Sequence, residues 1–207
     1  VNWASNGTGT ITDVKEFVRL AHEVVALTVV DAVHYALHKT IDVKDIDTYF
    51  LICSADKFFG PHIGVLYAKA SVGERIKSIR VLADDNMEMP SKFEIGTLSM
   101  ENAAGAMAAV NFIAGLGRVH EAYFADELEG LTGRRRLIVA GIKAIEAYED
   151  PLALKLRTEL AAIEGVKVYS PPEGTPKTST VSFTMEGVHA NEIGTYLGDH
   201  GIFVWDG

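Results

Sequence analysis

Three short and almost entirely apolar runs occupy the first third of the chain, at residues 26–31, 49–54 and 64–69, and each ends in a polar residue. A helical apolar pattern at residues 14–21 precedes the first run, and Thr12 and Asp13 can cap the helix that it predicts. A polar connection separates the first run from the second. Short strands that are apolar throughout are typical of a mostly parallel sheet that helices cover on both faces. The alternation therefore predicts an α/β fold.

After residue 100 the pattern becomes mainly helical, following an irregular stretch at 71–98 that we expect to be functional or interfacial. Beyond it, apolar periodicity and capping residues predict four helices and then a smaller β-α-β unit. The expected helices are residues from 101 onward, 119–129, 133–148 and 151–163, and the unit comprises strands 166–169, 180–184 and 202–205 around helix 189–200. We expect two domains, 1–130 and 131–207.

Charge and cysteine content exclude several classes of partner. The 207 residues carry 19 basic and 28 acidic side chains, a formal net charge of −9. An acidic surface repels phosphate backbones and anionic lipids, so we expect neither nucleic acid nor membrane as a partner. Cys53 is the one cysteine and cannot form an internal disulfide, which fits a reducing compartment such as the cytoplasm. The chain opens without Met and stops inside a strand-like pattern, so we interpret it as an internal fragment.

Polar side chains that could carry chemistry follow two of the apolar runs: Asp31 after the first, and Ser54 with Lys57 after the second. The carboxyl ends of neighbouring strands form the ligand crevice of an open α/β sheet. A lysine at such a place can form a Schiff base, and an aspartate beside it can hold a protonated ring nitrogen, the arrangement that pyridoxal phosphate (PLP) requires. From spacing alone, a solvated lysine and a capping aspartate remain open alternatives.

Other candidates have equally plain alternatives. His34 could be a core histidine bonded to a carbonyl group, and Asn6 and Thr97 could be turn residues. His34 and His38 lie four residues apart but lack an acidic third ligand, so we predict no metal site. Cys53 is flanked by apolar residues, and we expect it to be buried and unreactive.

Two motifs together are more specific. The stretch D-A-V-H from Asp31 to His34 and the stretch S-A-D-K-F-F-G-P from Ser54 to Pro61 resemble the cysteine desulfurase branch of the class V aminotransferases, whose pattern is D-x-x-Q/H followed by S-x-H-K-x-x-G-P. Weaker matches occur at residues 5–7, 93–97 and 201–203, so the resemblance covers essentially the whole chain. These enzymes are PLP-dependent and have fold type I.

The resemblance implies a fold and a set of roles. Residues 1–130 would be the C-terminal portion of the PLP-binding large domain, and 131–207 a linking helix with the start of a small α+β C-terminal domain. Lys57 would bind the cofactor aldehyde as an imine and then move the substrate Cα proton. Asp31 would hold the pyridinium nitrogen, and His34 the phenolic oxygen.

Three further residues would complete the cofactor site by the same resemblance. Ser54 would bind the phosphate, Asn6 would lie near the phenolic oxygen and the substrate carboxylate, and Thr97 would reach the phosphate of a neighbouring subunit. Asp56 stands where the family pattern has histidine. Because a carboxylate repels a phosphate, this substitution puts either cofactor affinity or the orientation of Asp56 in question.

The implied function is removal of sulfur from cysteine. The resemblance also implies an amino-acid substrate, a homodimer with a shared active site and a possible sulfur-acceptor protein. The family's persulfide cysteine has no counterpart within these residues, so a class V aminotransferase or another PLP lyase remains an alternative. A non-catalytic homologue that acts as a binding or scaffold protein is the second alternative, because Asp56 departs from the pattern.

Overall fold

The computed structural model describes residues 1–79, 88–94 and 96–206, so part of the irregular stretch expected at 71–98 lies outside the described residues. The chain forms two compact units. The first comprises residues 1–4 and 12–146, and the second comprises residues 5–11 and 147–207. The two domains expected from the sequence, with their boundary at 130/131, remain a prediction.

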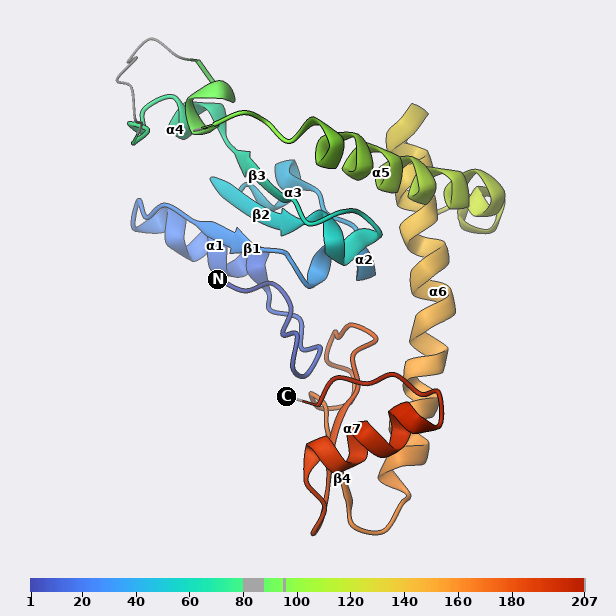
Figure 1. Ribbon diagram of the computed structural model, residues 1–207. Helices are drawn as coiled ribbons and strands as arrows, with labels where there is room; N and C mark the ends of the chain where they lie inside the picture. Colours follow the sequence, from blue (N-terminus) through green and yellow to red (C-terminus); the bar gives the residue numbers. More distant parts are fainter. Residues whose placement is uncertain (80–87, 95, 207) are drawn as a thin grey trace. The chain divides into compact units, whose positions relative to one another are not determined.

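A three-stranded sheet forms the centre of the first unit, with strands β1 (Val29–Asp31), β2 (Phe50–Ser54) and β3 (Gly64–Ala68) side by side in that order (Figure 1). β1 pairs with β2 in parallel, and β2 pairs with β3 antiparallel. All three expected strands are therefore confirmed. The last pairing is antiparallel because the connection from β2 to β3 is too short for the crossover that a parallel pair needs.

The first residues of the chain extend this sheet beyond β1. The Asp31 amide donates to the Val1 carbonyl, and the Trp3 amide donates to the Asp31 carbonyl, both at 2.8 Å. Asn2 thereby forms a parallel bridge with Asp31. Asp31 consequently has a backbone neighbour on each side, Asn2 on one and Ile52 of β2 on the other.

Helices pack around the sheet. The first of them, α1 (Val14–Glu23), begins where the Asp13 side chain accepts from the Glu16 amide at 3.0 Å, as the expected N-cap predicts. Its buried residues Val14 and Val18 lie four apart, on one face of the helix. The shorter helical elements are α2 (Tyr35–His38), α3 (Val43–Ile46), α4 (Ala70–Gly73), and the 3-10 turns η1 (Ala55–Phe58) and η2 (Ser91–Phe93).

Two long helices complete this unit: α5 (Met100–His120), and the part of α6 (Gly133–Ala161) that ends at Glu146. They cross in close contact (Figure 1). Leu128, Val139 and Ala140 form a buried cluster beside the connection between them. The helix expected at 119–129 is wrong: α5 ends at His120, and a 3-10 turn, η3 (Glu121–Phe124), follows.

Pro151 does not begin a helix, as the sequence predicted, but lies inside α6. Proline at an interior position removes one backbone hydrogen bond. The remaining turns on both sides of it still form one continuous helix of 29 residues. The loss affects a single turn, and the helix continues past it.

The second unit contains β4 (Val166–Tyr169) and β5 (Ser182–Met185), which pair antiparallel, and α7 (Ala190–Asp199). Thr10 of the loop 5–11 bridges to Lys177. The strand expected at 202–205 does not form: no ladder partner reaches this stretch in the described part of the chain, and Phe203 and Trp205 are almost fully exposed. Within the described ranges, no helix is both long and apolar enough to span a bilayer.

Candidate cofactor-binding site

The parallel strands β1 and β2 end at the same edge of the sheet. Asp31 is the last residue of β1 and lies in register with Ile52, two residues before the end of β2. Each strand leads directly into a short helical turn, α2 after β1 and η1 after β2, and these two turns contact each other. The edge thus brings together five of the seven site residues predicted from the sequence: Asp31, His34, Ser54, Asp56 and Lys57.

Lys57 projects from a tightly closed turn. The Gly60 amide donates to the Ala55 carbonyl at 2.7 Å, and a Cβ at Gly60 would lie 2.8 Å from the Ala55 Cβ. Phe59 ends the turn with φ at +69°, a left-handed conformation that is costly for a bulky residue. The turn fixes the backbone, while the Lys57 side chain stays 55% exposed and can reach a ligand.

The Asp31 carboxylate is held by its own backbone. Its Oδ1 accepts from the Val33 amide at 2.9 Å. This bond orients one carboxylate oxygen and leaves the other with acceptor capacity for a protonated nitrogen. Asp31 therefore has the geometry of an anchor for a cationic ring.

His34 immediately precedes α2 and lies close to two other basic side chains. Its ring centroid is 5.0 Å from that of His38. Burial, followed by the charges of His38 and Lys57, lowers the pKa of His34 below its usual 6.5. His34 is consequently neutral near pH 7, so one ring nitrogen can donate a hydrogen bond and the other can accept one.

Asp56 faces Ser54 and Lys57. The Ser54 hydroxyl donates to Oδ1 of Asp56, and the Lys57 Nζ lies 3.1 Å from Oδ2. The Ser54 hydroxyl and then the Lys57 ammonium hold the pKa of Asp56 below its usual range. The Asp56 carboxylate, whose orientation the sequence left open, therefore points toward Ser54 and Lys57.

Two neighbouring features of this edge were not predicted from the sequence. The rings of Trp3 and Tyr35 stack at 3.9 Å and 6°, joining the first residues of the chain to α2. Burial raises the pKa of Tyr35 to about 12. The sequence predicts no role for His38 at this edge, although its spacing of four residues from His34 is the signal that both rings share one side of a helix.

The remaining two predicted residues are exposed. Asn6 lies in the loop 5–11 of the second unit, where the Ser5 hydroxyl accepts from the amides of Gly7 and Thr8 at 3.2 Å. Thr97 lies in the segment that precedes α5. Their roles at a cofactor remain predictions.

The donor set at the strand ends fits PLP. It offers an accessible amine for an aldehyde, a carboxylate for a pyridinium, a neutral imidazole for a ring oxygen and a hydroxyl for a phosphate. Asp56 is the one member whose charge opposes the phosphate. Among the described residues no cluster of three metal-ligating side chains occurs, and burial raises the pKa of the half-buried Cys53 thiol.

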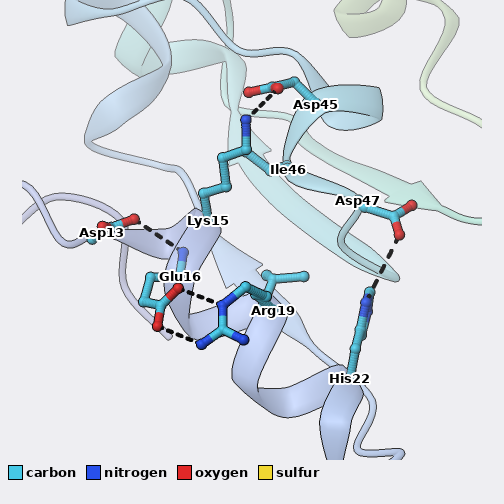
Figure 2. Close-up of a pocket in the computed structure, with 9 residues that line it drawn as sticks. Asp13, Lys15, Glu16, Arg19, His22, Asp45, Ile46 and Asp47 are labelled. Carbon is cyan, nitrogen blue, oxygen red and sulfur yellow. Dashed lines mark hydrogen bonds and ion pairs between the residues drawn. The ribbon is translucent and has the colours of Figure 1, made fainter.

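A separate hollow of about 450 Å³ lies between α1 and α3 (Figure 2). It contains none of the seven predicted site residues. Its basic side chains each face an acid: Lys15 lies 2.5 Å from Asp45, Arg19 binds Glu16, and His22 Nδ1 lies 3.8 Å from Asp47. Its charges are already paired at the surface, so we do not assign the cofactor to it.

Known proteins resemble the chain along its whole length. The sequence model of the family described as Aminotransferase class-V matches residues 1–129 and 130–207. The probable cysteine desulfurase 2 of Mycobacterium leprae is 31% identical over 97% of this chain and 45% of that protein. The probable cysteine desulfurase of Halalkalibacterium halodurans is 32% identical over 97% of this chain and 45% of that protein. The chain thus spans about half the length of these curated relatives.

Solved structures give the same result for the fold. The cysteine desulfurase of Thermococcus onnurineus NA1 superposes with a TM-score of 0.74 at 27% identity, covering 98% of this chain and 48% of that one. The cysteine desulfurase CsdA of Escherichia coli superposes with a TM-score of 0.73 at 24% identity, covering 98% and 46%, a likeness of fold. The predicted α/β architecture of fold type I is confirmed, and the chain belongs to the class V aminotransferase family.

Proposed function

We propose that this chain is the lysine-bearing part of a PLP-dependent enzyme that removes sulfur from cysteine. The observation that carries the proposal is the gathering of Lys57, Asp31 and His34 at the ends of two parallel strands. The named relatives support sulfur removal as the reaction, since those described above are cysteine desulfurases. The unpaired Cys53 supports a reducing, cytoplasmic location.

When bound, PLP supplies an aldehyde for an amine and a protonated ring that withdraws electrons from the substrate Cα. Lys57 would hold the aldehyde through its amine and, once the substrate amine has taken its place, would carry the Cα proton. Its long, half-exposed side chain permits both positions. Asp31 keeps the proton on the ring nitrogen, because its Val33-bound carboxylate presents a fixed negative charge.

His34 and Ser54 position the cofactor. The depressed pKa of His34 keeps its ring neutral, so that it can donate to an anionic ring oxygen without adding a charge. The Ser54 hydroxyl provides a donor for the phosphate at the end of β2. We assign Asn6 to the substrate carboxylate and Thr97 to the phosphate of a second subunit, which makes a homodimer part of the proposal.

The family also supports transamination as a second candidate reaction, since its description is that of an aminotransferase. Both reactions begin with an amino acid bound through its amine and with loss of the Cα proton. They differ in the fate of the side chain: a desulfurase hands sulfur to an acceptor protein or releases it, and an aminotransferase yields a keto acid.

The test uses the full-length protein. We expect an absorption band at about 410–430 nm from lysine-bound PLP. The band should be lost in Lys57→Ala. It should be kept in Lys15→Ala, the control variant, which removes an exposed lysine that is not one of the proposed site residues. With cysteine as the substrate and a thiol such as dithiothreitol as the reductant, we expect formation of alanine and release of sulfide. Keto acid without sulfide would instead establish the aminotransferase, and a protein that takes up no PLP would establish the scaffold alternative.

A further inference from the structure

The Asp56 carboxylate already binds the two side chains that PLP would need first, Ser54 for its phosphate and Lys57 for its aldehyde. Its Oδ1 accepts from the Ser54 hydroxyl, and its Oδ2 lies 3.1 Å from the Lys57 Nζ. The Asp56 side chain is only 17% exposed, whereas that of Lys57 is 55% exposed. Asp56 is therefore less exposed than the lysine that it contacts.

We propose that Asp56 competes with the cofactor: it holds Ser54 and Lys57 in the cofactor-free protein and has to release both when the phosphorylated aldehyde binds. This inference rests on the proposed function. It assigns to Asp56 a positioning role in cofactor capture that is separate from the reaction on the amino acid.

The hydroxyl of Ser54 can serve one acceptor at a time. It has a single O–H, which is donated to Asp56 in the structure. A phosphate oxygen at the same place must displace the carboxylate, and the two anions repel each other at short range. Binding of the phosphate group therefore requires Asp56 to rotate away from Ser54.

The amine of Lys57 is restrained by the same carboxylate. To bind the cofactor, Nζ must release a proton to water and form a C=N bond to the aldehyde carbon, while the aldehyde oxygen leaves as water. The ion pair with Asp56 holds Nζ at 3.1 Å from Oδ2, so this contact must break before Nζ can approach the aldehyde carbon. Because Ser54 and Lys57 lower the pKa of Asp56, the carboxylate is charged at neutral pH and the pair persists there.

The first experiment measures PLP affinity in the full-length protein after removal of its cofactor. Asp56→Asn keeps the shape of the side chain and removes its charge, so we expect its dissociation constant for PLP to be about fivefold to tenfold lower than that of the wild type. Asp45→Asn is the matched control, because it removes one exposed carboxylate from the Lys15 pair on α3. It should leave the constant unchanged within about twofold.

The second experiment needs no cofactor. Trinitrobenzenesulfonate reacts with amines that it can reach, and mass spectrometry of the peptide that contains position 57 reports the rate of labelling at Lys57. In cofactor-free protein we expect Asp56→Asn to speed the labelling of Lys57 by about twofold to fivefold, with exposed Lys44 as the internal reference. An equal rate in wild type and variant would overturn the restraint on Lys57.

The outcomes separate this inference from the function on which it rests. If wild type and Asp56→Asn both take up PLP with equal constants, Asp56 is not a competitor and the proposed function stands. If neither takes up PLP, the proposed function fails, and the competitor role fails with it. Tighter binding together with faster labelling in Asp56→Asn supports the inference in both of its parts.

Discussion

The Cβ that Gly117 lacks would lie 2.8 Å from the backbone nitrogen of Gly141 and 1.8 Å from the Leu137 carbonyl oxygen. A Cβ at Gly141 would lie 2.0 Å from the Ile113 carbonyl oxygen in return. The two helices thus meet backbone to backbone where α5 crosses α6. This crossing lies in the first unit, which also contains the strand ends and Lys57.

Alanine at either contact glycine should destabilise the protein strongly, because the clash is with backbone that cannot move aside. We expect Gly117→Ala and Gly141→Ala each to lower the free energy of unfolding by at least about 3 kcal/mol. Gly115→Ala is the control: it lies on the same helix with open space around it, and should raise stability by up to about 1 kcal/mol. Urea unfolding of the full-length protein measures the free energy of unfolding of all three variants. An unchanged value for Gly117→Ala would contradict the close contact between α5 and α6.

The pair of buried threonines that comes just before β1 and β2 in the chain, Thr28 and Thr48, gives a second prediction. The hydroxyls of Thr28 and Thr48 lie 2.9 Å apart, and Thr28 Oγ1 also accepts from the Tyr49 amide at 3.2 Å. Thr28→Val leaves that amide without its partner and should cost about 2 kcal/mol, whereas Thr48→Val should cost about 1 kcal/mol. The double valine variant should cost less than the sum, and strict additivity in a double-mutant cycle would argue against the pair.

Stability should depend on His34 at mildly acidic pH. Its pKa is below 6.5 in the folded protein, so between the two values the unfolded chain binds a proton that the folded protein does not. The wild type should therefore lose stability as pH falls below 6.5. His34→Gln should flatten this loss in thermal scans from pH 7.5 to about pH 5, and the exposed His62→Gln should retain the wild-type slope.

The ion pair between Lys39 and Glu146 ties the end of α2 to α6. The Lys39 Nζ and the Glu146 Oε1 lie 2.5 Å apart, and the two side chains are 17% and 24% exposed. Glu146→Gln should lower the free energy of unfolding by about 1–2 kcal/mol. The same change in the exposed pair, Asp45→Asn, should cost less than about 0.5 kcal/mol. Equal costs would mean that burial adds nothing to the first pair.

Asp31 should matter for the reaction more than for cofactor capture. Asp31→Asn keeps an acceptor for the Val33 amide but no longer presents a full negative charge. We expect PLP uptake within about tenfold of wild type and a fall of at least about 100-fold in exchange of the substrate Cα proton with solvent. Unchanged proton exchange would remove Asp31 from its proposed role.

The local sequence was sufficient to predict those elements whose formation depends on one dominant physical cause. The apolar runs predicted β1, β2 and β3, and the capping residue Asp13 predicted the start of α1. The polar residues after the strands predicted a common edge, because parallel neighbours end together.

The sequence was insufficient where the surrounding structure decides. The direction of β3 follows from the length of a turn rather than from its apolar pattern, and Pro151 is tolerated because the surrounding helix is long. The stretch 202–205 has the composition of a strand but no partner to pair with in the described chain. The orientation of Asp56 depends on a hydroxyl two residues away and an ammonium one residue away, and no spacing rule predicts it.

The segment that carries Lys57 connects β2 to β3, and hydrogen bonds between these two strands hold both of its ends. Ser54 pairs with Gly64, and the Ala55 amide donates to the Ile63 carbonyl at 2.9 Å. A residue added or deleted inside it would shift one strand against the other and turn every side chain of that strand to the opposite face. Gaps should consequently be absent from this stretch when homologous genes are aligned, and laboratory libraries that vary its length should yield no folded clones.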